Sequence, residues 1–115
     1  MIKIIQGDKV TKKCTVLKQS DGTPLDLTNY NITLSVKRSI YDTTYAIQKT
    51  VGNGGIVKDS PASTGVFYIY FVNIDTQNLE EGKYVYDIEI EDTGTGEPYT
   101  IQAPSDFIIE LGVTT

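Results

Sequence analysis

The sequence predicts an all-β protein built from two packed antiparallel sheets with seven to nine short strands. Apolar and polar residues alternate over short segments, which is the period of a half-buried strand. Residues that favour turns separate these segments at intervals of roughly ten residues, as in sandwiches and barrels. Strands do not alternate with helical segments, so a parallel α/β sheet is not expected.

The clearest strand lies in residues 30–39, where Ile32, Leu34 and Val36 share one face. Residues 74–81 are the only candidate helix, of one or two turns. The predicted strands are 2–6, 13–19, 30–39, 45–51, 56–57, 65–72, 83–92, 99–103 and 107–112. The residues expected to point inward are Ile32, Leu34, Val36, Phe67, Ile69, Phe71, Tyr84, Ile88, Ile90, Phe107 and Ile109, with Tyr86 and Leu111 on the same faces.

A leucine, a turn glycine and a tyrosine open the strand at 83–92, and they stand at Leu79, Gly82 and Tyr84. This pattern is typical of a tyrosine corner, in which the hydroxyl bonds a backbone group a few residues upstream. We therefore expect an immunoglobulin-like sandwich. Tyr86 stands where antibody domains carry cysteine, so the antibody-type disulfide is not expected.

Composition excludes several classes of function. The length of 115 residues favours one domain over residues 1–115. The chain has no histidine, so Ser-His-Asp triads and His-ligated metals are excluded. A net charge of −5 with ten basic residues disfavours nucleic-acid binding, and no apolar run is long enough to span a membrane. Cys14 alternates within a strand and is expected to be a small core residue. We expect no enzyme activity and no cofactor.

Three carboxylates, Asp87, Glu89 and Glu91, share one face of the strand at 83–92. A paired-acid glycosidase site is one interpretation, and a calcium site that also includes Asp92 is another. Alternation places polar residues on a solvated sheet face by default, and no stretch has the ligand spacing of a calcium loop. The solvated face is the favoured interpretation.

A family resemblance supplies the function that composition does not. Gly7-Asp8, the segment 21–28, Thr64-Gly65-Val66-Phe67 and the segment 79–88 occur in this order along the chain. This order resembles the N-terminal domain of bacteriophage baseplate upper proteins, and more broadly the small immunoglobulin-like modules of tailed phages. Lys9 departs from that pattern, because the family often has threonine there, and its members are usually longer.

The resemblance implies a structural virion protein of the tail or baseplate, assembled in the host cytoplasm. Its partners would be other phage structural proteins or a second copy of itself. The first expected contact is the short terminal strand with Ile2 and Ile4, whose edge carries no blocking charge beyond Lys3 and can pair with another chain. The second is formed by Tyr68 and Tyr70, opposite the core face of their strand.

Two other functions stay open. A carbohydrate-binding module would use exposed aromatic rings, for which Tyr41, Tyr45 and Tyr99 are the candidates. A bacterial surface adhesion module would occur in tandem behind a signal peptide.

Overall fold

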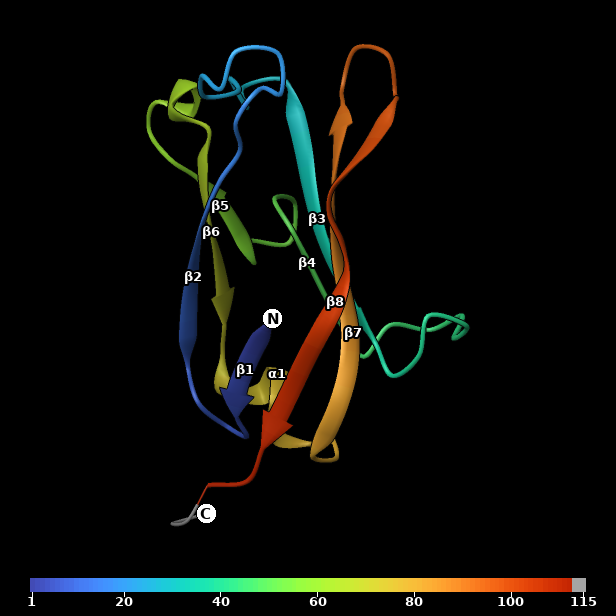
Figure 1. Cartoon of the computed structure of the whole chain (residues 1–115). Coiled ribbons are helices and arrows are strands. Elements are labelled where there is room, and N and C mark those ends of the chain that lie inside the picture. Colours follow the sequence, from blue (N-terminus) through green and yellow to red (C-terminus); the bar gives the residue numbers. More distant parts are fainter. Residues whose placement is uncertain (113–115) are drawn as a thin grey trace.

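A computed structural model describes residues 1–112, so the last three residues of the predicted domain lie outside the described part. This part is mostly β, with eight strands and one short α-helix (Figure 1). The strands are β1 (Ile2–Ile5), β2 (Val10–Thr15), β3 (Tyr30–Lys37), β4 (Ile47–Thr50), β5 (Ile56–Lys58), β6 (Val66–Phe71), β7 (Gly82–Asp92) and β8 (Pro98–Glu110). The helix is α1 (Asn73–Gln77), and one 3₁₀ turn, η1, spans Ala62–Thr64.

The strands form a five-stranded sheet, in the order β1-β8-β7-β3-β4, and a three-stranded sheet, in the order β2-β6-β5. Figure 1 shows the three-stranded sheet facing the strands β3, β7 and β8. The expectation of purely antiparallel sheets is wrong for one pair. β1 runs parallel to β8, with Ile2 opposite Phe107 and Ile5 opposite Glu110, so the larger sheet is mixed. A parallel pair needs a long connection, and most of the chain lies between these two strands.

The core lies between the two sheets and is formed by alternate residues of both. All eleven residues expected to point inward are buried, and Tyr86 is buried with them. β3 shows why the alternation was informative: Ile32, Leu34 and Val36 are fully buried, while the residues between them face outward. Leu111 is exposed, because β8 ends at Glu110 and the chain leaves the sheet there.

Two expected strands, 99–103 and 107–112, are one continuous strand in the structure. β8 runs through Pro104, and its pairing with β7 is irregular on either side of Ile88. A proline is tolerated here because no strand of the described residues lies beside the outer edge of this part of β8. The expected gap between the two strands, at residues 104–106, is instead strand with irregular pairing to β7 beside it.

Candidate contact surfaces

The tyrosine corner predicted at the start of β7 has the expected hydrogen bond. The Tyr84 hydroxyl donates to the backbone carbonyl of Glu80, four residues upstream, at 2.8 Å. The Arg38 guanidinium lies over the Tyr84 ring, 4.6 Å from its centroid. Gly82 has φ of +130°, and Leu79 packs against the core. These residues hold the segment between α1 and β7 against the larger sheet, which is a structural role.

The expected contact through the strand of Ile2 and Ile4 stays a prediction. β1 is at an edge of its sheet, as expected, but Ile2 is 6% exposed and Ile4 is 1% exposed. Pairing with β8 turns both side chains into the core beside Phe107 and Ile109, so any contact with a partner would use the backbone of β1 along its free edge. The alternation of these two isoleucines with Lys3 in the sequence already indicated that they are buried, because apolar and polar residues alternate in the same way along a half-buried strand.

Tyr68 and Tyr70 lie on the outer face of the three-stranded sheet. Their rings stack with centroids 6.5 Å apart, and Tyr70 is 39% exposed. Val57 of β5 lies opposite Tyr68 in the ladder and is 46% exposed. Lys13 of β2 flanks Tyr68 on the other side. We call Val57, Tyr68 and Tyr70 the tyrosine face, a small apolar surface of a kind that suits protein contacts.

The three loop tyrosines do not form one platform. Tyr41 is 87% exposed on the loop between β3 and β4, which projects from the body of the molecule (Figure 1). Tyr45, on the same loop, has the Lys37 ammonium 5.0 Å from its ring centroid. Tyr99 pairs with Ile90 near the other end of the sheet. The loop that carries Tyr41 and Tyr45 starts beyond Lys37, and Lys37 lies roughly 17 Å along the sheet from the position of Tyr99. One sugar therefore cannot stack on all three rings.

The carboxylates of β7 lie on the outer face of the larger sheet. Glu89 and Glu91 are exposed and Asp87 is half-buried. They stand opposite Thr33, Asn31 and Ser35 of β3. A shallow hollow of about 220 Å³ beside them is lined by Asp87, Glu89, Lys37 and Tyr45, among others. Within residues 1–112, no group of three or more Cys, Asp or Glu side chains is arranged to hold a metal ion.

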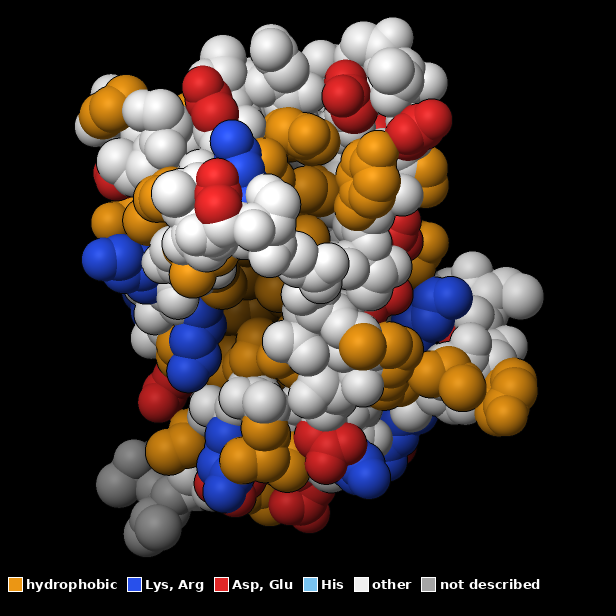
Figure 2. All heavy atoms as spheres, turned by 45° about the horizontal axis from the view of Figure 1, so that its top comes forward, with side chains coloured by type: hydrophobic (Ala, Val, Ile, Leu, Met, Phe, Trp, Pro, Cys, Tyr) orange, Lys and Arg blue, Asp and Glu red, His pale blue; other side chains and the backbone are white. Residues whose placement is uncertain are grey.

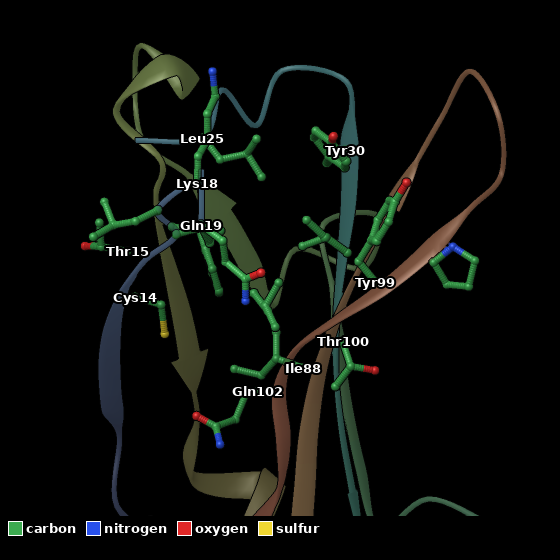
Figure 3. Close-up of a pocket in the computed structure, with 16 residues that line it drawn as sticks. Cys14, Thr15, Lys18, Gln19, Leu25, Tyr30, Ile88, Tyr99, Thr100 and Gln102 are labelled. Carbon is green, nitrogen blue, oxygen red and sulfur yellow. The ribbon is translucent and has the colours of Figure 1, made fainter. Parts of the chain in front are cut away.

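A groove that sequence reasoning missed opens between the edges of the two sheets. It has a volume of about 800 Å³ and lies between residues 14–19, at and after the end of β2, and the first half of β8. Figure 2 shows an apolar hollow there, with basic side chains along one rim. In Figure 3, Cys14 and Gln19 line one side, while Ile88 and Tyr99 line the other. No local pattern could have revealed the groove, because it depends on how far apart two distant strands lie.

Cys14 lies at the wall of this groove, where it is half-buried. Burial raises the pKa of its thiol, and the positive charge of Lys12 partly opposes this effect. Since a raised pKa keeps a thiol protonated at neutral pH, Cys14 is a weak nucleophile in this position.

The described residues thus define a mostly β protein with two sheets, a groove with an apolar floor and a tyrosine face. No model of a protein family matches the chain, and the search of curated proteins found no significant match. Among residues 1–112, no helix has the length and apolar character needed to cross a membrane.

Proposed function

We propose that this chain is an immunoglobulin-like, non-catalytic module that connects structural proteins in the tail or baseplate of a phage. It would assemble in the host cytoplasm and contact other virion proteins or a second copy of itself. The resemblance in the order of turn and corner motifs supports the virion setting. The tyrosine face is the observation that supports a contact role.

The strand order supports the immunoglobulin-like part of the proposal. The order β8-β7-β3-β4 corresponds to strands G, F, C and C′ of variable-type domains, and β2-β6-β5 corresponds to B, E and D. Tyr84 then stands near the start of strand F, where tyrosine corners occur. The parallel β1 pairs with the strand that corresponds to G.

The tyrosine face supports binding through side chains that need no rearrangement. Two stacked rings are already held against each other, so ordering them on binding costs little rotamer entropy. Tyrosine combines apolar area with a polar tip and is enriched at protein interfaces. In a symmetric assembly, many copies of a small contact add up through multivalency. The placement of Tyr41, Tyr45 and Tyr99 gives no comparable support to carbohydrate binding or surface adhesion.

Incorporation into particles tests this function. A phage or prophage that carries the gene is made with Tyr68→Ala and Tyr70→Ala together, and purified particles are examined for the chain by mass spectrometry. We expect the wild-type chain in the particles and a large loss of the double variant. Tyr41→Ala is the matched control, because it removes an exposed ring from the loop of the other sheet, and it should be incorporated normally.

Two outcomes would contradict the proposal. Particles that lack the wild-type chain would rule out a virion role. Normal incorporation and infectivity of a folded double variant would show that the tyrosine face is not the contact surface.

A further inference from the structure

The groove exists because β1 covers only part of β8. β1 pairs with the last four residues of β8, from Phe107 to Glu110. The preceding residues of β8 pair with β7 on one edge, and no strand within residues 1–112 lies on the other. Packed sheets lie about 10 Å apart, whereas paired strands need about 4.8 Å, so β2 and β8 cannot close the opening by pairing with each other.

The free edge of β8 has the length and chemistry of a strand-pairing site. Pro98 and Pro104 lack amide hydrogens, and they bound the segment 99–103. Within the described chain, no strand other than β7 pairs with this segment. A strand edge of this kind presents unpaired backbone donors and acceptors to another chain. The floor beside it is apolar, with Phe67, Ile88 and Ile90.

The lysines near the groove indicate which kind of partner strand would bind there. Lys12 is half-buried on the inner side of β2, two residues from Cys14 of the groove wall, but does not itself line the groove. Among the described residues that line the groove, Lys18 is the only charged one. Neither lysine takes part in the ion pairs found among residues 1–112. An inward-pointing charge on an edge strand disfavours a purely apolar partner and favours one that brings a carboxylate.

We propose that this groove binds an extended segment of a partner protein, which adds a strand to β8 opposite residues 99–103. Alternate apolar side chains of the segment fill the groove, and an acidic side chain among them pairs with Lys12. This inference rests on the proposed connecting function and names the chemistry of one partner. It uses a different surface from the tyrosine face.

Synthetic peptides test the proposal on the isolated chain. The probe is a short capped peptide that alternates valine with threonine and has one central valine replaced by glutamate. Cys14, the only cysteine, is the reporter. We expect the peptide to slow the reaction of Cys14 with a thiol reagent severalfold, and to protect the amides of residues 99–103 from hydrogen exchange.

Charge reversal supplies the matched control. Lys12→Glu should abolish the effect of the glutamate peptide and create a preference for the same peptide with lysine at that position. Lys13→Glu changes the neighbouring residue, which points to the outer face of β2, so it should leave the preference unchanged.

Four outcomes would overturn the proposal. The first is no slowing and no protection at the solubility limit of the peptide. The second is slowing without protection of 99–103, which indicates a small apolar ligand site. The third is a slower reaction of Cys14 at higher protein concentration without any peptide, which assigns the groove to a second copy of the chain. The fourth is an equal response of the Lys12 and Lys13 variants. None of them affects the incorporation test, which concerns Tyr68 and Tyr70.

Discussion

At the scale of single residues, a hydrogen bond from a buried side chain fixes the segment that leads into a strand. Tyr84 is buried, and its hydroxyl donates a hydrogen bond to the carbonyl of Glu80 just before the strand begins. Tyr99 makes a hydrogen bond of the same length, 2.8 Å, to the Glu97 carboxylate, but on the surface. The two bonds differ in burial, and burial decides how much their loss costs.

Tyr84→Phe should lower the free energy of unfolding by about 1 kcal/mol, because it removes one hydrogen bond and leaves the Glu80 carbonyl without that donor. The ring and its contact with Arg38 remain. Urea unfolding followed by circular dichroism measures the change. Tyr99→Phe is the control and should have little effect, since water replaces the exposed bond. Equal stability of Tyr84→Phe and the wild type would show that the corner adds nothing to stability.

At the scale of elements, β1 is short and terminal but belongs to the core. Ile2 and Ile4 point inward against β8, while Ile5 is 42% exposed. The Lys3 ammonium lies 3.5 Å from a Glu110 carboxylate oxygen across the same pair of strands. That ion pair is exposed and adds little, so packing of the two isoleucines holds the strand.

Ile4→Ala should lower the free energy of unfolding by about 2 to 5 kcal/mol, through lost apolar burial and the cavity left behind. Ile5→Ala on the same strand is the matched control and should change stability by no more than about 0.5 kcal/mol. Thermal and urea unfolding of the two variants give the comparison. Similar stability of both variants would mean that β1 is not packed as described.

At the scale of the whole molecule, one apolar cluster joins both sheets, so we predict that the chain unfolds as a single domain. An ion pair adds a second link. Lys49 of β4 lies 2.7 Å from Asp75 of α1, and both side chains are nearly buried. Asp75 also accepts a hydrogen bond from the Val72 amide, just after β6. This carboxylate therefore connects the larger sheet to the chain that leaves the smaller one.

Asp75→Asn should lower the free energy of unfolding by about 3 kcal/mol, because it leaves the Lys49 ammonium buried without its counter-charge. In a single cooperative unit, hydrogen exchange of core amides in β3 and β6 should report the same loss. Asp106→Asn breaks the exposed pair with Lys83 and is the control, with an expected change below about 1 kcal/mol. Different losses in β3 and β6 would contradict a single cooperative domain.

Local alternation determined which faces of the strands are buried. The inward residues of β3, β6 and β7 followed from their period of two, because side chains on a strand alternate between its faces whatever strand lies beside it. The hydrogen bond of Tyr84 was also predictable, since its donor and acceptor lie within four residues of each other. These features depend on short stretches of chain, and a short stretch is visible in the sequence.

The tertiary structure alone decided what depends on distant segments. Sequence alternation did not reveal that Ile2 pairs in parallel with Phe107, or that β8 continues through Pro104 as a single strand. The groove and the half-buried position of Lys12, two residues from Cys14 of the groove wall, have the same origin. Each requires knowing which strand lies next to which and where a strand is missing. That choice is made by the packing of the whole core, because backbone pairing is nearly the same for any two strands.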